Sequence, residues 1–583
     1  MDIHTGDAAQ VAGSAWTDAM FGYRYTAFRG IGRFNDQLAD NQVGLIGWPG
    51  GFLAEEQTSR YGLNFDGLFN PEINRPGLGD MFSHARSEGA GLSVFLPTAR
   101  YVGQDDLLRA DIRAFMGDLL SGHYGQPPAT LIFEIGSEYY CSFPGGSGQA
   151  AQYGHVASIY VQEMAAALND PAVNILGIDP EIAVQAGRTL AEDAAIRAHF
   201  DRDTLAEIDQ IVHHRFAFLA EGVDGSADGF HDVLEAWRAD MAAAGGEGPG
   251  LFLSAYNVGS YTRDEALGDF LAIDGAAGGG LSAADIDLEG RSHDKFETFW
   301  QDQLSRRDYG GEHPRLLLEM LNEYKDEGLT HAAVFGTDMI HPGRLSLTDV
   351  NGVAQDFVGQ DMLDMLAESV VGTRSLSVNL TNGRGDEIWT YGFENDDRLV
   401  IFLSADETPP EAVTLRLAGL GGTYRQVSVD SLRAEVPEDW MARFGIVDNP
   451  NVDESPEAQT FAVGIRTGLE PDIGSDGITV RFSAPNEVIR LSFAKTDLGA
   501  EQIAGYSDGQ AFDIPDDLVQ QDVTGEGDFP MTADLPMVAM AEEDGHGFAD
   551  PAAQDDHGGG DGGGGGGGFA LALLPFLFLL GGF

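Results

Sequence analysis

Glu138 is the residue of this sequence best placed to do chemistry. It follows an apolar, β-favouring run (130–135) that ends at Gly136. In a barrel of parallel strands, catalytic groups collect just beyond the C-terminal ends of the strands. A carboxyl group there can act as a general acid/base in cleaving a glycosidic bond, a reaction that needs a second carboxyl group across the bond. The sequence therefore predicts a carbohydrate-directed pocket around Glu138.

Three acidic residues are candidates for the second carboxyl group. Asp338 follows the last predicted barrel strand, and Glu55 and Glu56 follow a Pro-Gly-Gly turn. Glu134 lies in the same run as Glu138, where the alternation of side chains puts it one layer deeper on the same face. We therefore predict a structural hydrogen-bonding role for Glu134 rather than a catalytic one.

Aromatic and polar residues follow the other predicted strands. Aromatic rings pack against the C–H faces of sugars, and polar groups bind the hydroxyl edges. The Pro-Gly-Gly turn would let the backbone approach a ligand closely, and two adjacent histidines of one strand cannot both face inward. The predicted substrate-binding residues are Trp48, Gly50, Gly51, Arg100, Tyr101, Ser137, Tyr139, His213, His214, Tyr256, Asn257 and Phe335.

Eight short apolar runs, most of them separated by helical patterns, would position these residues. Apolar residues recur at three- and four-residue spacing in segments such as 105–120, 149–168 and 228–244, as in amphipathic helices. Eight alternations of strand and helix predict an α/β fold, a closed (β/α)8 TIM barrel. A Gly/Ala/Asp-rich segment, 274–287, predicts an inserted loop after the seventh strand. The runs begin near Phe21, Val43, Leu92, Thr130, Glu181, Ile208, Leu251 and His331.

The sequence changes character after the barrel. Short alternating runs separated by turn residues fill 375–493 and predict an all-β sandwich. The following acidic and glycine-rich stretch has the composition of a disordered linker. We therefore predict a barrel over 1–371, a β-sandwich over 372–496, a linker over 497–568 and an apolar segment over 569–583.

The apolar stretch 569–580 is short for a membrane span. Its twelve residues would make a helix of about 18 Å, against a hydrocarbon core of about 30 Å. Pro575 disfavours a helix further. We predict that 569–583 is a sorting or export signal that contacts a membrane or the export machinery; a true anchor and a simple docking tail are the alternatives.

Charge and composition limit the partners. The chain has 33 basic and 93 acidic residues, a formal net charge of −60, which repels nucleic acid. The single cysteine, Cys141, excludes an intramolecular disulfide. The histidine pair lacks a third ligand at a diagnostic spacing, so we predict no metal and no cofactor. The N-terminal residues lack the pattern of a conventional signal peptide, and we predict an extracellular or cell-surface protein exported by another route.

Together these motifs resemble clan A retaining glycoside hydrolases of the α-L-arabinofuranosidase/β-xylosidase kind (families thirty-nine, fifty-one and seventy-nine). Such proteins read Arg-aromatic-Pro-Gly-Gly after strand two, where this chain reads Gly-Trp-Pro-Gly-Gly (47–51). They read Trp-Glu-Ile-Gly-Asn-Glu after strand four, where it reads Phe-Glu-Ile-Gly-Ser-Glu (133–138), and His213-His214-Arg215-Phe216 matches their sixth strand. The resemblance covers about 20–495 and implies a barrel, a β-sandwich and Glu138 as general acid/base.

Three positions depart from that pattern. The resemblance implies a nucleophilic glutamate where this chain has Ala255, an active-site arginine where it has Gly47, and an asparagine that contacts the sugar 2-hydroxyl where it has Ser137. Three hypotheses therefore stay open. The protein is a catalytically inactive glycan-binding or surface/matrix protein; or it is a hydrolase with a relocated carboxylate or an inverting mechanism, whose carboxyl groups stand about 6.5–9.5 Å apart; or the nucleophile lies elsewhere in the chain.

Overall fold

The computed structural model describes most of the chain up to residue 495. The described residues all lie in one compact unit, Met1–Asp497, so the predicted linker and apolar segment fall outside them and stay predictions. Within the described part, no helix is both long enough and apolar enough to cross a membrane. The described residues are 2–5, 14–27, 30–39, 41–56, 62–66, 76–143, 148–217, 222–246, 248–258, 263–286, 293–304, 311–337, 345–349, 351–381, 388–406, 408–409, 412–419, 424–435, 437, 439, 443, 462–470, 472–474 and 477–495.

Eight parallel strands form a closed barrel, as the sequence predicts. Each strand pairs with the next one along the chain, and the first pairs with the last. Every strand begins within two residues of its predicted start. The strands are β2 (Gly22–Arg24), β3 (Leu45–Trp48), β4 (Gly91–Leu96), β5 (Leu131–Ile135), β6 (Glu181–Gln185), β7 (Gln210–Ala217), β8 (Gly250–Val258) and β9 (Leu329–Val334).

The inside of the barrel is layered. Six buried apolar side chains form one layer, and Ile132, Val212 and Phe252 belong to it. Two residues further along these strands, on the same inner face, stand Glu134, His214 and Ser254. The interior therefore changes from apolar to polar toward the C-terminal ends of the strands, which form the mouth of the barrel.

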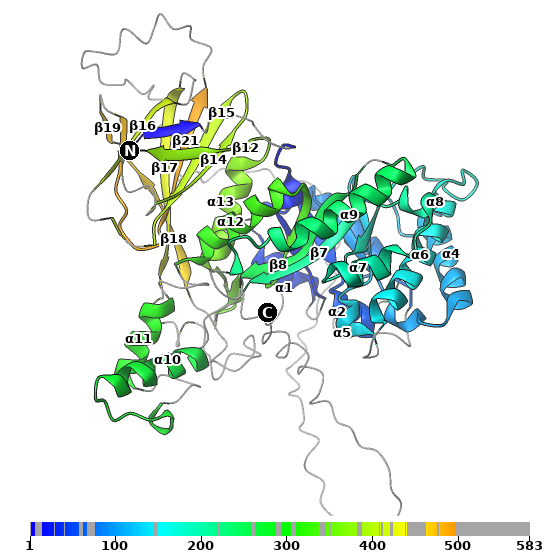
Figure 1. Ribbon diagram of the computed structural model, residues 1–583, viewed down its shortest axis with the longest axis horizontal. Helices are drawn as coiled ribbons and strands as arrows, with labels where there is room; N and C mark the ends of the chain where they lie inside the picture. The colour runs from blue at the N-terminus through cyan, green and yellow to red at the C-terminus, as the bar shows by residue number, and fades with distance from the viewer. Residues whose placement is uncertain are drawn as a thin grey trace, which may run out of the picture. The chain divides into compact units, whose positions relative to one another are not determined.

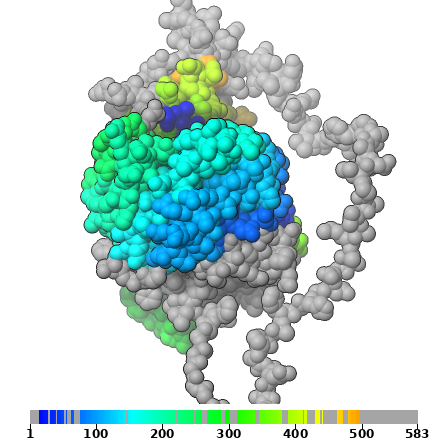
Figure 2. Space-filling view, turned by 90° about the vertical axis from the view of Figure 1, so that its right-hand side faces the viewer, coloured from blue at the N-terminus to red at the C-terminus, as the bar shows by residue number. Residues whose placement is uncertain are grey.

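Helices cover the outside of the barrel, and in Figure 2 the blue-to-cyan segments form one continuous surface over it. Helices α6 and α9 match the predicted segments 149–168 and 228–244. The predicted loop 274–287 is wrong at its start, because α10 continues to Ala276. The helices are α1 (Ile31–Gln37), α2 (Gly51–Glu56), α3 (Leu78–Glu88), α4 (Asp105–Ser121), α5 (Tyr139–Ser142), α6 (Gln149–Leu168), α7 (Leu190–Arg197), α8 (Arg202–Leu205), α9 (Asp228–Ala244), α10 (Arg263–Ala276), α11 (Asp294–Leu304), α12 (His313–Asp326) and α13 (Val358–Val370).

Two further sheets and a hairpin make up the β-rich part. The six-stranded sheet has the order β12-β14-β15-β21-β17-β18 and the five-stranded sheet β13-β1-β16-β20-β19, while β10 and β11 pair as a hairpin. The strands are β1 (Asp2–Thr5), β10 (Ser346–Thr348), β11 (Ala354–Asp356), β12 (Arg374–Leu376), β13 (Val378–Thr381), β14 (Trp389–Glu394), β15 (Arg398–Ser404), β16 (Val413–Gly419), β17 (Tyr424–Glu435), β18 (Val463–Leu469), β19 (Asp472–Gly474), β20 (Gly477–Val480) and β21 (Val488–Lys495).

The N-terminal strand belongs to the sandwich and not to the barrel. β1 pairs antiparallel with β13 and parallel with β16, and its blue arrow lies among the sandwich strands in Figure 1. The predicted boundary at 371 therefore misses residues 2–5. Four residues carry too short a pattern to show which sheet they join.

Candidate functional site at the barrel mouth

The backbone after β5 turns sharply and presents Glu138. Gly136 and Glu138 both have positive φ, 75° and 44°, and a side chain in this left-handed region is strained. The Glu138 carbonyl accepts hydrogen bonds from the Cys141 and Ser142 N–H groups, at 2.7 and 3.0 Å, in the first turn of α5. The Glu138 side chain is 20% exposed, so it can reach a molecule in the mouth.

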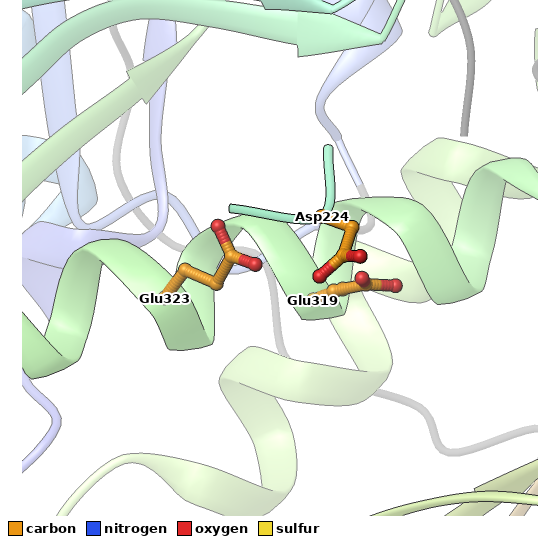
Figure 3. A group of neighbouring side chains, drawn as sticks. All are labelled: Asp224, Glu319 and Glu323. Atoms are coloured by element: carbon orange, nitrogen blue, oxygen red, sulfur yellow. The ribbon is translucent and has the colours of Figure 1, made fainter. Parts of the chain in front are cut away.

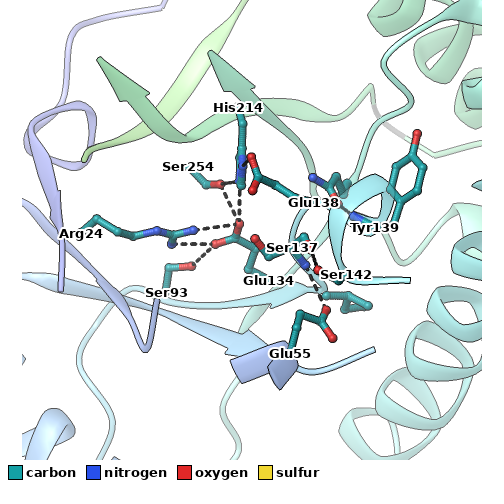
Figure 4. Close-up of polar contacts among 12 residues, drawn as sticks. Arg24, Glu55, Ser93, Glu134, Ser137, Glu138, Tyr139, Ser142, His214 and Ser254 are labelled. Atoms are coloured by element: carbon teal, nitrogen blue, oxygen red, sulfur yellow. Dashed lines mark hydrogen bonds and ion pairs between the residues drawn. The ribbon is translucent and has the colours of Figure 1, made fainter. Parts of the chain in front are cut away.

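The Glu134 carboxylate is the centre of a buried hydrogen-bond network (Figure 4). Arg24 on β2 donates from Nη1 to Oε2 at 3.0 Å and from Nη2 to Oε1 at 3.3 Å. Ser93 on β4 donates to Oε2 at 3.3 Å, and Ser254 on β8 donates to Oε1 at 2.6 Å. Burial alone would raise the pKa of Glu134, but the Arg24 charge and the bonds from His214 and Arg24 hold it below its ordinary value. These contacts agree with a structural role.

His214 on β7 links Glu134 to Glu138 (Figure 4). Its Nε2 lies 2.9 Å from Ser254 Oγ and 3.6 Å from Glu134 Oε1, and its Nδ1 lies 3.4 Å from Glu138 Oε1. Because Ser254 gives its single hydrogen to Glu134, the His214 Nε2–H must donate to Ser254. Burial alone would lower the pKa of His214, but the two carboxylates raise it. The network therefore favours a doubly protonated imidazole.

The pKa of Glu138 is lowered by the same network. Burial acts in the opposite direction, but a hydrogen bond and the charge of His214, a hydrogen bond from Tyr140 and the charge of Arg24 outweigh it. The Tyr140 hydroxyl donates to Glu138 Oε1 at 3.0 Å, and the Arg188 guanidinium lies 4.4 Å from the centre of the Tyr140 ring. Glu138 is therefore ionised in this structure at neutral pH.

Ala255 faces the mouth beside His214. The two residues pair across β7 and β8, and paired residues of a parallel sheet point to the same face. The register shifts at His213/His214, so Ser254 is an extra residue of the bulge type. Its hydroxyl also bonds Glu134 on the inner face. The bulge therefore brings Ser254 and Ala255 to the inner face together, and neither carries a carboxyl group.

An aromatic pair stands further toward the rim. Phe216 and Phe335 meet edge to face, with ring centroids 5.7 Å apart, and both are partly exposed. Phe216 lies two residues beyond His214, on the same face of β7. Among Trp48, Tyr101, Tyr139, Tyr256 and Phe335, the aromatic residues predicted to contact a ligand, Phe335 is the one that is partly exposed.

Glu55 takes part in the architecture below the mouth. It is 2% exposed, and its carboxylate accepts hydrogen bonds from the backbone N–H groups of Thr98, Ala99 and Ser137 and from the Thr98 hydroxyl. Burial raises its pKa against the pull of these bonds. Its placement as a second catalytic carboxyl group is thus wrong, because both oxygens are already used. Asp338 and the side chain of Glu56 lie outside the described residues.

The glycine pair serves close packing of the protein itself. A Cβ on Gly50 would lie 2.8 Å from Thr26 Cα, and one on Gly51 would lie 2.0 Å from Ser137 Oγ. The expectation that these glycines let the backbone approach a ligand is therefore corrected: the close partners are neighbouring strand ends. Ser137 is 5% exposed and packs against Gly51.

Six predicted ligand contacts are engaged by the protein itself. Trp48, His213 and Tyr256 point outward because their strand neighbours face inward, whereas Tyr101, Tyr139 and Asn257, the last on the inner face opposite Phe216, are held by hydrogen bonds of their side chains. Trp48 packs on Phe65, Tyr101 donates to Asp111, Tyr139 donates to Glu192, His213 stacks on Phe230 at 4.1 Å, Tyr256 is fully buried, and Asn257 donates to the Phe335 carbonyl. Arg100 is half-buried beside the Tyr101 ring, 5.1 Å from its centre.

Three residues of the network were missed as site residues by sequence reasoning: Arg24, Ser93 and Ser254. Arg24 carries the one usable signal, since a charged residue within a short buried strand demands a buried partner. The two serines carry none, because an uncharged hydroxyl does not demand a charged partner as a buried guanidinium does.

An acidic group lies outside the mouth. Oxygens of Asp224, Glu319 and Glu323 lie within 4.8 Å of one another (Figure 3), an arrangement that could bind a cation. Glu319 already pairs with Arg315 at 2.6 Å, and burial raises its pKa to about 7. Glu323 accepts from Gly225 N–H at 2.8 Å. Protein partners therefore hold these two carboxylates in place.

Solved structures of known proteins share this fold. A family 51 α-L-arabinofuranosidase from Bifidobacterium longum aligns with a TM-score of 0.53 and 11% identity, over 84% of this chain and 99% of its own. The α-L-arabinofuranosidase of Thermotoga maritima, solved with arabinose, aligns with a TM-score of 0.50 and 13% identity, over 82% and 96%. A GH51 arabinofuranosidase from Xanthomonas axonopodis pv. citri aligns with a TM-score of 0.50 and 12% identity, over 84% and 99%.

No family model matches the sequence, and no curated protein matches it. The shared architecture is a barrel followed by antiparallel sheets, so the fold is that of the clan A glycoside hydrolases. The family 51 arabinofuranosidases share this fold, and the resemblance named that family together with families thirty-nine and seventy-nine. Identities this low establish the fold alone and leave the activity to the residues of the mouth.

Proposed function

We propose that this protein binds carbohydrate at the barrel mouth and does not cleave it by the retaining mechanism. Glu138 accepts hydrogen bonds from sugar hydroxyls, and the rim aromatic pair packs against the ring. The observation that carries the proposal is Ala255, whose methyl group faces the mouth beside His214.

A methyl group cannot attack an anomeric carbon. Retaining hydrolysis needs two carboxyl groups about 5–5.5 Å apart, one of which forms a covalent bond to the sugar. On the side of the mouth where the resemblance implies that nucleophile, β8 offers Ser254 and Ala255. The carboxylate that shares His214 with Glu138 is Glu134, which is fully buried and held by Arg24. Neither arrangement supports double displacement.

The charge state of Glu138 also supports binding. A general acid must be protonated near the working pH, and glycosidases achieve this by raising the pKa of the acid. Here His214 and Tyr140 hold the pKa of Glu138 below its ordinary value. An ionised carboxylate accepts hydrogen bonds from hydroxyl groups strongly, which suits the recognition of a neutral sugar.

A hydrolase is the second candidate, and one observation favours it. Glu138 keeps a strained backbone, φ 44°, and strain of this kind collects at functional sites. Asp338 or Glu56 would then supply the second carboxyl group in an inverting reaction, with a separation of about 6.5–9.5 Å.

Binding and turnover should be measured with the same preparation of the full chain. A panel of aryl glycosides reports turnover, and calorimetry with arabinan, xylan and their oligosaccharides reports binding. Glu138→Gln is the test variant. Glu235→Gln, on the exposed face of α9 and paired with Arg238, is the matched control for a lost carboxylate.

The proposal expects binding without turnover, weakened about tenfold or more by Glu138→Gln, as for the loss of a charged hydrogen bond, and unchanged in the control. Turnover that Glu138→Gln abolishes would overturn the proposal in favour of the hydrolase, and Asp338→Asn would then identify the second carboxyl group. A preparation that shows neither binding nor turnover would overturn both candidate functions.

We also propose an extracellular or cell-surface location, with 569–583 contacting a membrane or the export machinery and with no nucleic-acid partner. The acidic composition and the glycine-tethered apolar segment support this. Fractionation of cells that make the full chain, against a chain ending at 568, tests it. Equal retention of both inside the cell would contradict it.

A further inference from the structure

We infer that Arg24 is the positioning residue of this site: it takes the volume that a side chain at position 47 would need and holds Glu134, so that His214 stays shared with Glu138. The inference rests on the proposed function for its consequence in binding. Its structural part, the placement of Arg24, Gly47, Glu134 and His214, is tested in the unliganded protein.

Arg24 and residue 47 compete for one volume. An ideal Cβ on Gly47 would lie 2.7 Å from Arg24 Nη1 and 2.8 Å from Arg24 Cδ. The guanidinium cannot retreat, because it lies 4.0 Å from the centre of the Phe95 ring and bonds Glu134 through two nitrogens. The neighbouring strands β2 and β3 pair Arg24 with Gly47, so both residues face inward at the same height.

An arginine on β2 therefore replaces one on β3. The resemblance implies an arginine at position 47, and this chain has glycine there. The glycine is the condition for Arg24, since any larger residue would strike its side chain. Positions 24 and 47 therefore depend on each other. The site keeps a positive charge, which lies on β2 at Arg24 instead of on β3 at position 47.

The consequence for the site passes through Glu134. Arg24 and Ser93 occupy Oε2, while Arg24 and Ser254 occupy Oε1. His214 is then the outer neighbour of Oε1, at 3.6 Å, and its Nδ1 faces Glu138. Without Arg24, the imidazolium would be the cation left to pair with Glu134. It would move toward that carboxylate and leave Glu138 to Tyr140.

The first test is the titration of His214, followed by NMR of its imidazole in the unliganded full chain. Removing a nearby cation raises the proton affinity of the remaining groups, so Arg24→Gln should raise the midpoint of His214 by about one pH unit or more. Arg24→Lys keeps the charge but not the two-nitrogen geometry, and should give a smaller rise. A midpoint that neither variant moves would overturn the inference.

The second test is a double-mutant cycle, and its first arm, Gly47→Ala, leaves the pair of Arg24 and Glu134 in place. Gly47→Ala should destabilise the protein when Arg24 is present and be tolerated with Arg24→Gly, a coupling of about tenfold in the unfolding equilibrium constant. Gly32→Ala is the control, because a Cβ there meets nothing within 4 Å. Additive effects would overturn the inference.

Binding separates the inference from the proposed function. Suppose that the Arg24 variants move the titration midpoint of His214 and that the Arg24/Gly47 cycle shows coupling, but that no glycan binds. The inference then stands and the proposed function fails. If glycans bind and Arg24→Lys changes neither the midpoint nor the affinity, the proposed function stands and the inference fails.

Discussion

The two sides of the barrel mouth differ in what they keep buried. The β5 side carries two carboxylates, Glu134 and Glu138, and each has charged or hydroxyl partners. The β8 side carries a hydroxyl and a methyl group, Ser254 and Ala255. His214 stands between them and is engaged with both carboxylates.

The difference separates a framework of buried charges from a side that carries no charge. A buried charge is stable only with its partners. On the β5 side, the Glu134 carboxylate has four such partners: Arg24, Ser93, Ser254 and His214. Ala255 makes no such bond, so the network does not depend on its methyl group. The supporting network is thus retained on one side while the reactive group implied for the other side is absent.

The largest effect is expected when the β5 side is broken. Glu134→Ala leaves Arg24 and His214 without their buried anion and should lower the free energy of unfolding by about 3–5 kcal/mol, measured by urea denaturation. Glu134→Gln, which keeps an acceptor for Ser254, should cost less. The exposed variant Glu235→Gln is the control. If Glu134→Ala lowers the free energy of unfolding no more than this control does, the β5 side does not stabilise the barrel.

Ser254→Ala removes the contact between the two sides. The hydroxyl donates to Glu134 at 2.6 Å and accepts from His214, and a hydrogen bond to a charged group is worth about 1.5–3 kcal/mol. A loss of that size is expected in the same denaturation experiment. Ser93→Ala, with its longer 3.3 Å bond to the same carboxylate, should cost less, and the reverse order would contradict the network as described.

Ala255→Glu puts a third carboxylate at the mouth and tests the β8 side directly. Overpacking at this buried position should cost about 1–3 kcal/mol, and the added charge should raise the titration midpoint of His214. Ala255→Ser, which adds one atom, is the size control. An Ala255→Glu variant as stable as the parent would mean that the β8 side has room for a carboxylate. The two sides would then not differ in their capacity to hold one.

The smallest effect is the pH dependence of stability. The raised pKa of His214 gives stability that is complete below about pH 6.5 and is lost as pH rises through the folded-state pKa. The lowered pKa values of Glu134 and Glu138 give stability present above about pH 4.5 and lost as pH falls through theirs. In the parent protein, stability measured by thermal unfolding should fall as the pH rises above about 6.5. The His214→Gln variant should not show this fall. A pH profile that the substitution leaves unchanged would contradict a charged imidazole.

Part of the site was predictable because strand alternation is a local property. The depth of Glu134 below Glu138 and the opposite orientations of His213 and His214 follow from the two-residue period, and the structure agrees with both. Trp48 and Tyr256 were misplaced because each is the outward neighbour of an inward residue. A rim motif contains both faces, and its composition does not separate them.

Other contacts join residues far apart in the chain. Glu55 bonds the N–H of Ser137, and β1 pairs with β13 and β16. No periodicity of the sequence reports such pairs, because one depends on how the barrel closes and the other on how β13 and β16 leave room for a strand between them.

The sequence by itself determined the eight strands of the barrel, the sandwich that follows and the position of Glu138 at a strand end, since hydrophobic periodicity and turn residues act over a few neighbouring positions. Only the tertiary structure decided that Arg24 fills the space beside Gly47, that a bulge brings Ser254 and Ala255 to the inner face, and that His214 joins two carboxylates. Those facts depend on side chains from different strands competing for one closed volume, and the charge of each group is set by the partners that share it.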